Sequence, residues 1–294
     1  MMMKKVAVIG VGAMGAPMAM NIDKVGFDLV VCDRSQQARA PFEALGIRTT
    51  ASAADCADCD AVIVLVATPE QAETVVLGSD GLVSRLDGGK PLLVFMGTVS
   101  PDTVTSIQAK VAPSGIRVVD APVSGGVVNA RTGTLAIMMG GRREDCDELW
   151  PLMEAMGRQI FYCGHLGAGQ ATKIVNNIIG ITNVLAAAEA YRIALDNGLI
   201  LSDALTVFEA GTGRNFFTSP GSDAIQTFAV STATSSEFDS FLAILRKDID
   251  LALSIGKGSG PLPGISSLRS VLAEAGDETL ETWRRVAAAV AQKG

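Results

Sequence analysis

The segment Lys5-Val-Ala-Val-Ile-Gly-Val-Gly-Ala-Met-Gly15 decides the fold of this chain. A short β-rich run, Lys5–Ile9, leads directly into the Gly-x-Gly-x-x-Gly of Gly10–Gly15. A helical pattern follows, and a second apolar run, Asp28–Cys32, ends at Asp33. A strand, a glycine turn, a helix, a second strand and an acidic residue about twenty positions on are the full context of a dinucleotide-binding βαβ unit.

Each glycine of this turn has its own task in such a unit. Gly10 permits the tight turn, Gly12 lets the backbone approach a pyrophosphate, and Gly15 allows the helix to pack closely on the strand. The free N–H groups and the positive dipole end of the helix then face the phosphates. Together with the loops after the second and fourth strands, this predicts a set of cofactor contacts: Gly10, Gly12, Ala13, Met14, Gly15, Asp33, Arg34 and Ala67.

The acidic residue at the end of the second strand predicts NAD rather than NADP. Asp33 is expected to accept hydrogen bonds from the adenosine ribose hydroxyls and to repel a 2′-phosphate. Arg34 leaves NADP open as the less favoured cofactor, because a guanidinium there can stack on adenine or reach a phosphate.

Further strand and helix patterns alternate along the first half of the chain, and this predicts a parallel, doubly wound sheet. From Gly164 onward strand signals cease and the sequence is helical. We therefore predict an α/β Rossmann-type NAD-binding domain over residues 1–164 and an all-α domain for substrate binding and oligomerisation over residues 165–294. The remaining expected strands are Ile47–Thr49, Ala61–Val66, Pro91–Phe95, Arg117–Ala121, Thr134–Gly140 and Gln159–Cys163.

A long interdomain helix is expected to begin near Gly169. Lys173, Asn176 and Asn177 lie near one face of it because they are three or four positions apart. The neighbouring positions are apolar on almost every side, which predicts a helix buried all round. An ammonium and two amides in such a helix must be paired or must face a functional cavity. The alternative is a lysine that reaches the surface at the helix start and two asparagines that bridge backbone groups.

Ligands of doubly wound sheets lie outside the carboxyl ends of the strands, where the Asp120–Gly126 segment is placed. Its Ser124-Gly125-Gly126 turn exposes consecutive backbone N–H groups beside a hydroxyl, which suits a carboxylate. A plain turn is the equal alternative, because serine and glycine are common turn residues.

Composition narrows the range of partners. The net charge of −7 argues against nucleic acid and anionic membranes, and 48% hydrophobic residues provide ample core. The chain has five scattered cysteines and a single histidine; a Cys-x-x-Cys at Cys56 and Cys59 has no second pair, so we expect no metal site. Free thiols predict a cytoplasmic protein. The long apolar helix contains three asparagines and a glutamate, so we expect no membrane span.

Four segments together resemble the β-hydroxyacid dehydrogenase family, which includes 3-hydroxyisobutyrate dehydrogenases and tartronate semialdehyde reductases. The resemblance covers nearly the whole chain, and Asp-Ala-Pro-Val-Ser-Gly-Gly with a downstream Lys-x-x-Asn-Asn is highly specific. The segments are Val8–Asn21, Asp120–Gly126, Gly167–Asn177 and Lys247–Leu253.

The resemblance implies roles for the matching positions. Lys173 resembles the catalytic lysine, and Asn177 a substrate-binding amide. Ser124, Gly125 and Gly126 resemble the substrate carboxylate site. Thr98 and Lys247 fall where the family contacts the cofactor near its nicotinamide. A homodimer or homotetramer is also implied.

This chain departs from the family pattern in two loops. Phe95-Met-Gly-Thr98 stands where members often have Asp-x-Ser-Thr, and Ala67-Thr68-Pro69 where a Leu-Pro is common. A third segment, Gly211–Phe217, should help line the substrate pocket, but its specificity cannot be read from sequence. The identity of the substrate therefore stays open.

These features together predict reversible hydride transfer between NAD and C3 of a short 3-hydroxy carboxylic acid, with Lys173 as general acid and base. The acid could resemble 3-hydroxyisobutyrate or be a hydroxy-sugar acid such as threonate or glycerate. Imine or semialdehyde reduction on the same fold is an alternative, although imine reductases usually replace the lysine. A sugar-acid-phosphate decarboxylating dehydrogenase would be much longer. A non-catalytic dinucleotide-binding scaffold is the alternative from another class.

Overall fold

The computed structural model describes residues 3–219 and 224–291 and divides into two compact units. Unit 1 is Met1–Lys173 and unit 2 is Ile174–Gly294. The division expected from the end of the strand signals, between residues 164 and 165, stays a prediction.

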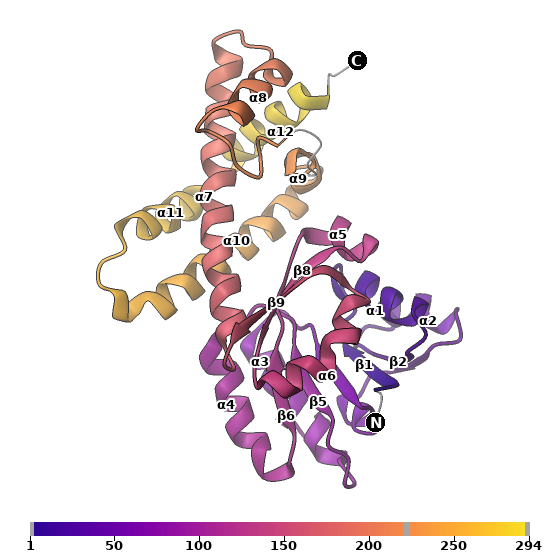
Figure 1. Ribbon diagram of the computed structural model, residues 1–294. Helices are drawn as coiled ribbons and strands as arrows, with labels where there is room; N and C mark the ends of the chain where they lie inside the picture. The colour runs from indigo at the N-terminus through magenta and orange to yellow at the C-terminus, as the bar shows by residue number, and fades with distance from the viewer. Residues whose placement is uncertain (1–2, 220–223, 292–294) are drawn as a thin grey trace. The chain divides into compact units, whose positions relative to one another are not determined.

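Unit 1 is built on one twisted sheet, shown in indigo to magenta in Figure 1. The strand order is β3-β2-β1-β4-β5-β6-β8-β7, with β9 paired to β8. The strands β1 to β6 pair with one another only in parallel, which confirms the Rossmann-type sheet. The strands are β1 (Lys5–Ile9), β2 (Asp28–Cys32), β3 (Arg48–Thr50), β4 (Ala61–Val64), β5 (Leu92–Phe95), β6 (Arg117–Asp120), β7 (Val123–Ser124), β8 (Leu135–Gly140) and β9 (Gly157–Gly164).

The predicted doubly wound sheet is parallel over β1 to β6, but one edge contains antiparallel pairs that the sequence patterns did not predict. β8 runs antiparallel to β6 and to β7, while β9 is parallel to β8. The segment between β6 and β8 holds only β7 and the short helix α5 (Gly126–Thr132), and the chain reverses direction through it. The sequence patterns did not predict α5.

Helices cover both faces of the sheet because its strands alternate their side chains. Val6 and Val8 belong to one apolar layer, and Ala7 and Ile9 to the other. The first layer includes residues of α1 (Gly15–Lys24), α2 (Gln36–Glu43), α5 and α6 (Arg143–Glu154). The second includes residues of α3 (Pro69–Leu77), α4 (Pro101–Val111) and the 3₁₀ turns η1 (Ala53–Cys56) and η2 (Leu82–Arg85), and another such turn, η3 (Ala112–Ser114), follows α4.

Unit 2 is helical, as expected. Its core gathers around Trp283, whose ring makes edge contacts with Phe228, Phe238 and Phe241. The helical pattern of the sequence predicts helices over Ser202–Gly211, Glu237–Ile255, Pro263–Ala275 and Glu278–Gln292. Four observed helices begin and end within two residues of these ranges, apart from Gln292, which lies outside the described residues; the helix α9 was not predicted. The helices are α7 (Ala168–Asp196), which begins in unit 1, α8 (Leu201–Ala210), α9 (Ala224–Ser231), α10 (Ser235–Ile255), α11 (Pro263–Glu274) and α12 (Asp277–Ala291), with a 3₁₀ turn η4 (Gly256–Ser259) (Figure 1).

The long helix α7 is not buried all round, contrary to the sequence expectation. Ile181, Val184 and Tyr191 are buried in the core, but Val175 is 50% exposed and Ile179 is 59% exposed. The helix therefore has two apolar faces, and the described residues bury only the face that includes Ile181, Val184 and Tyr191. Among the described residues α7 is the one helix long and apolar enough to cross a membrane, a weak signal that the core helix of a water-soluble protein also gives.

Candidate functional site

The glycine turn after β1 has the geometry that a dinucleotide requires. Gly10 has φ +93°, and a Cβ there would overlap the Leu65 carbonyl oxygen. A Cβ at Gly15 would overlap the Gly10 carbonyl oxygen, so the start of α1 can approach the turn only because this residue is glycine. At Gly12 a Cβ would meet nothing within 4 Å, which leaves room for a phosphate beside the backbone.

A cavity of about 520 Å³ opens at the carboxyl ends of β1, β2 and β4. Five of the predicted cofactor residues line it: Gly10, Gly12, Asp33, Arg34 and Ala67. Ala13, Met14 and Gly15 belong to the same turn but do not line the cavity, and neither do Thr98 and Lys247. The cavity wall also contains residues that the sequence did not single out, among them Ala51, Glu70, Gln71, Thr74 and Asp80.

Asp33 is held by the backbone at the end of β2. Its Oδ2 accepts a hydrogen bond from Val11 N at 2.9 Å, and its Oδ1 accepts one from Ser35 N at 2.9 Å. Each carboxylate oxygen has a second lone pair, and the side chain is only half-buried at the cavity wall. Asp33 can therefore accept further hydrogen bonds from a ribose.

The loops after β4 and β5 lie against each other. A Cβ at Gly97 would overlap the Val66 carbonyl oxygen, so no side chain fits there without a backbone shift. Gln71 Oε1 accepts a hydrogen bond from Ala67 N at 2.9 Å and fixes the first of these loops. Phe95 and Met96 are buried in the two opposite apolar layers of the sheet. The departure from Asp-x-Ser-Thr therefore replaces polar groups with core side chains and a close backbone contact.

The Ser124-Gly125-Gly126 turn joins β7 to α5. Gly125 has φ +129° and Gly126 has φ +71°, both in the region that favours glycine. Ser124 is half-buried, and the two glycines are exposed. A Cβ at Gly126 would meet nothing within 4 Å, so the backbone here is open to a ligand. This geometry suits a carboxylate nest, although a turn before a helix has it too.

Asp120, the last residue of β6, holds the beginning of α7. It is fully buried, and its Oδ1 and Oδ2 accept hydrogen bonds from Gly167 N at 2.7 Å and Gln170 N at 2.6 Å. Burial raises the pKa of the Asp120 carboxyl to about 6, while these hydrogen bonds oppose the rise. A Cβ at Gly140 or Gly169 would overlap its carboxylate oxygens, so the contact is closely packed.

Gln170 connects α7 to the loop that contains Thr98. It is fully buried, its Oε1 accepts a hydrogen bond from Val99 N at 3.1 Å, and its Nε2 donates one to the Gly97 carbonyl at 2.8 Å. Lys173 follows three residues later, about one helical turn along, and is 9% exposed.

In unit 2, Asn177 and Lys247 meet at Asp248. Asn177 Nδ2 donates a hydrogen bond to Asp248 Oδ2 at 2.6 Å. The Lys247 ammonium lies 3.1 Å from Asp248 Oδ1, as an ion pair without hydrogen-bond geometry. Asp248 is 4% exposed. Two predicted site residues that are seventy positions apart are thus held on one carboxylate that the sequence analysis quoted but assigned no role.

The Cys-x-x-Cys pair lies in the apolar layer behind the cavity. Cys56 and Cys59 are buried, and burial raises the pKa of the Cys59 thiol to about 12. A hydrogen bond with Cys32 and burial raise the pKa of Cys56 as well. Thiols in this state are poor metal ligands. Within residues 3–219 and 224–291 no group of three histidine, cysteine or acidic residues is placed to hold a metal ion.

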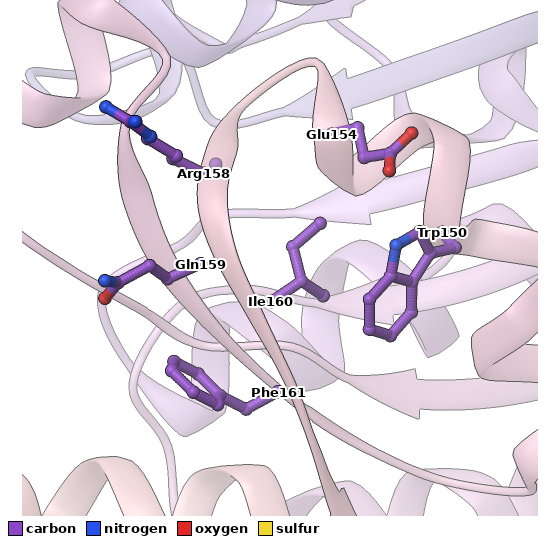
Figure 2. A pocket seen from close by; sticks show the side chains of 7 residues that line it. Trp150, Glu154, Arg158, Gln159, Ile160 and Phe161 are labelled. Atoms are coloured by element: carbon purple, nitrogen blue, oxygen red, sulfur yellow. The ribbon is translucent and has the colours of Figure 1, made fainter.

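A second hollow of about 450 Å³ lies between α6 and β9. Figure 2 shows Ile160 of β9 beside the Trp150 ring, and Gln159 and Phe161 on the other side of the strand. None of the predicted site residues lines it. The candidate functional region of unit 1 is therefore the cavity at β1, β2 and β4 together with the start of α7.

Comparisons with known proteins agree with this geometry. Residues 5–164 match the family model described as the NAD binding domain of 6-phosphogluconate dehydrogenase. Residues 167–290 match the model described as the NAD-binding region of NADP-dependent 3-hydroxyisobutyrate dehydrogenase. The chain belongs to the β-hydroxyacid dehydrogenase family.

Relatives of this β-hydroxyacid dehydrogenase carry related names. A 3-hydroxyisobutyrate dehydrogenase of Pseudomonas aeruginosa is 34% identical over 86% of this chain and 85% of its own length. An NAD-dependent L-serine dehydrogenase of the same organism is 34% identical over 90% of each chain. The solved structure of Mycobacterium tuberculosis 3-hydroxyisobutyrate dehydrogenase with L-serine has a TM-score of 0.78 at 29% identity, over 97% of this chain and 99% of that one. This chain is accordingly an oxidoreductase that acts on CH–OH groups, with an NAD-binding domain.

Three buried, hydrogen-bonded residues of this β-hydroxyacid dehydrogenase were assigned no role from the sequence: Asp120, Gln170 and Asp248. Each lies inside a motif that was quoted, within four positions of a residue that was assigned a role. The available signal was polarity within a buried pattern, since a carboxylate or an amide among apolar neighbours must find partners. Those partners lie 47 to 73 positions away along the chain, which no local pattern reveals.

Proposed function

We propose that this chain oxidises the C3 hydroxyl of a short 3-hydroxy carboxylic acid with NAD, using Lys173 as general base, and catalyses the reverse reduction with Lys173 as general acid. The observation that carries the proposal is the position of Lys173. It is a nearly buried amine one turn beyond a helix start that is hydrogen-bonded to the loop containing Thr98.

Each predicted residue has a task in this reaction. The Ser124–Gly126 turn binds the substrate carboxylate, and this orients the carbinol carbon C3. The neutral Lys173 amine takes the hydroxyl proton during oxidation, and its ammonium returns a proton during reduction. Asn177 holds the substrate hydroxyl or the amine in line. NAD, when bound, accepts the hydride from C3, so the products are the 3-oxo acid and NADH.

The cofactor is proposed to be NAD rather than NADP. The half-buried Asp33 carboxylate lines the cavity, and Glu70 and Asp80 add further acidic groups to the same wall. A 2′-phosphate would meet these charges, while Arg34 supplies one opposing cation. Gly10, Gly12, Ala13, Met14 and Gly15 cradle the pyrophosphate in this proposal, and Ala67, Thr98 and Lys247 complete the cofactor contacts.

The substrate class follows from what the relatives are named for. 3-Hydroxyisobutyrate and L-serine both carry a primary hydroxyl on the carbon next to the α-carbon of a carboxylate. A carboxylate nest and a proton-exchanging amine would serve either acid. Glycerate shares the same arrangement of hydroxyl and carboxylate.

We also propose a cytoplasmic homodimer or homotetramer that binds neither nucleic acid nor membrane. The exposed apolar face of α7 in unit 2 supports an assembly, because Ile179 and Ile193 are each 59% exposed. Five free cysteines support a reducing compartment. Light scattering that finds only monomers at working concentration would contradict the assembly.

The proposed activity is tested by following NADH formation with 3-hydroxyisobutyrate, L-serine, glycerate, L-threonate and 4-hydroxybutyrate at alkaline pH, with NAD and NADP in parallel. We expect turnover of at least one 3-hydroxy acid, with a higher kcat/KM for NAD. The 4-hydroxybutyrate arm is the control for hydroxyl position. Tight NADH binding without turnover of any acid would contradict the proposal.

A further inference from the structure

The start of α7 is attached to the sheet through two buried side chains that take no part in the proposed chemistry. Asp120 and Gln170 are each fully buried, and together they make four hydrogen bonds to backbone groups. Two of these bonds hold the first helical turn, and two hold the loop that follows β5. Buried polar groups with all their partners in place fix one geometry, since a shift would leave several of them unpaired.

We propose that Gln170 is a positioning residue that fixes the Gly97–Val99 loop relative to Lys173, and that Asp120 holds the helical turn from which Gln170 reaches that loop. The inference rests on the proposed function, because it concerns the alignment of the proposed proton-exchanging amine with the proposed nicotinamide contact at Thr98.

The amide side chain suits this position for a specific reason. The loop presents one donor, Val99 N–H, and one acceptor, the Gly97 carbonyl, on the two sides of Thr98. A glutamine satisfies both at once because its side chain carries one acceptor and a donor group. Glutamate could satisfy only the first, and an apolar side chain neither.

The Gly97–Val99 loop has little room to adopt another conformation. Gly97 packs directly against the Val66 carbonyl, and Gly97 N donates a hydrogen bond to the Val64 carbonyl at 3.2 Å. On the helix side, Gly169 packs against Asp120 and the Met138 carbonyl. Gln170 therefore joins two closely packed segments, and the residues on either side of this connection, Thr98 and Lys173, are the proposed nicotinamide contact and the proposed general base.

Gln170→Met and Gln170→Glu test the inference in the full-length protein. Gln170→Met keeps nearly the same volume and loses both loop bonds. We expect kcat to fall about tenfold to a hundredfold, the cost of a misplacement of about 1 Å, while the Kd for NADH changes little. The primary deuterium isotope effect on kcat should rise as hydride transfer becomes slower. Gln170→Glu, which can still accept from Val99 N–H, should lie between Gln170→Met and the wild type.

The Val99 amide gives a readout that does not depend on activity. In Gln170→Met this N–H loses its acceptor, so its hydrogen exchange should become about tenfold faster. Asp145→Asn is the matched control. Asp145 is a buried carboxylate that pairs with Arg117 at 2.7 Å, at the opposite end of β6 from Asp120. It should lower stability without changing kcat, the isotope effect or Val99 exchange.

Unchanged Val99 exchange in Gln170→Met would overturn the inference, as would an unchanged kcat in an enzyme whose wild type is active. A kcat loss matched by an equal loss of NADH binding, as from partial unfolding, would also overturn it. A wild type that oxidises no hydroxy acid would instead overturn the proposed function, and the inference with it.

Discussion

Two strands of the unit 1 sheet, β2 and β6, run into an aspartate whose carboxylate accepts two backbone N–H groups. Asp33 accepts from Val11 and Ser35 beside an open cavity, and Asp120 accepts from Gly167 and Gln170 in the interior. The same arrangement of donors therefore serves two purposes. A carboxylate at a cavity wall keeps lone pairs for a ligand, whereas a fully buried one attaches a helix.

The largest expected difference between Asp33 and Asp120 is in the free energy of unfolding that each alanine variant loses. Asp120→Ala leaves two buried N–H groups without an acceptor, so the free energy of unfolding should fall by about 3 kcal/mol. Asp33→Ala should lower it by less than about 1 kcal/mol, because water can reach the vacated donors. Urea unfolding of both variants measures the difference. Equal losses would show that the two carboxylates are not used differently.

The pH dependence of stability should distinguish the buried carboxylate next. The pKa of Asp120 is raised from 3.8 to about 6, so between these values the folded state binds a proton that the unfolded state releases. Its contribution to the free energy of unfolding is therefore fully present below about pH 3.8 and is lost as the pH rises through about 6. Other charged or titratable side chains lie near Asp120 or near its neighbour Cys146, and both proteins compared in the next experiment contain them. They are His165, Asp145, Asp147 and Arg143.

Urea unfolding of the wild type and Asp120→Asn at about pH 4.5 and about pH 6.5 measures this contribution. The stability of the wild type relative to the variant should fall by about 2 kcal/mol between the two pH values. Other titrating groups are common to both proteins and cancel in the difference. A relative stability that rises with pH would contradict the raised pKa.

The half-buried carboxylate of Asp33 at the cavity wall should have the smaller effect on stability, and its main effect should be on cofactor binding. Asp33→Ala loses the charged acceptor for the ribose hydroxyls, so KM for NAD should rise about tenfold. KM for NADP should change less, since the repelling charge is gone as well. Initial rates with both cofactors decide this. An unchanged ratio of the two kcat/KM values would remove Asp33 from cofactor selection.

The contrast between Asp33 and Asp120 also explains which parts of the site could be predicted from the sequence. The β1 turn, Gly10, Gly12 and Asp33 belong to one local motif whose geometry is set within about thirty residues, and three of the residues it pointed to line the cavity at β1, β2 and β4. The carboxyl end of β6 depends on partners from α7, and Asn177 in unit 2 depends on Asp248 of α10. Such pairs arise only when distant segments meet, so the polar residues were visible in the sequence but their partners were not.

Two differences from expectation have the same origin. The antiparallel β8 follows from the reversal through α5, which is a tertiary arrangement rather than a local pattern. The exposed face of α7 has an apolar sequence typical of a buried helix, but within the part of the chain that the structure describes Val175 and Ile179 stay 50% and 59% exposed. Apolar periodicity indicates which side chains need burial, and it does not indicate what buries them.

The central claim is that Lys173 exchanges the proton in hydride transfer, and the turnover of Lys173→Ala tests it most directly. We predict that turnover of a hydroxy acid accepted by the wild type falls at least about a hundredfold while the Kd for NADH stays nearly unchanged. Lys110→Ala, which removes an exposed lysine paired with Glu73 on the surface, is the control and should keep wild-type turnover. Wild-type turnover in Lys173→Ala would contradict the account.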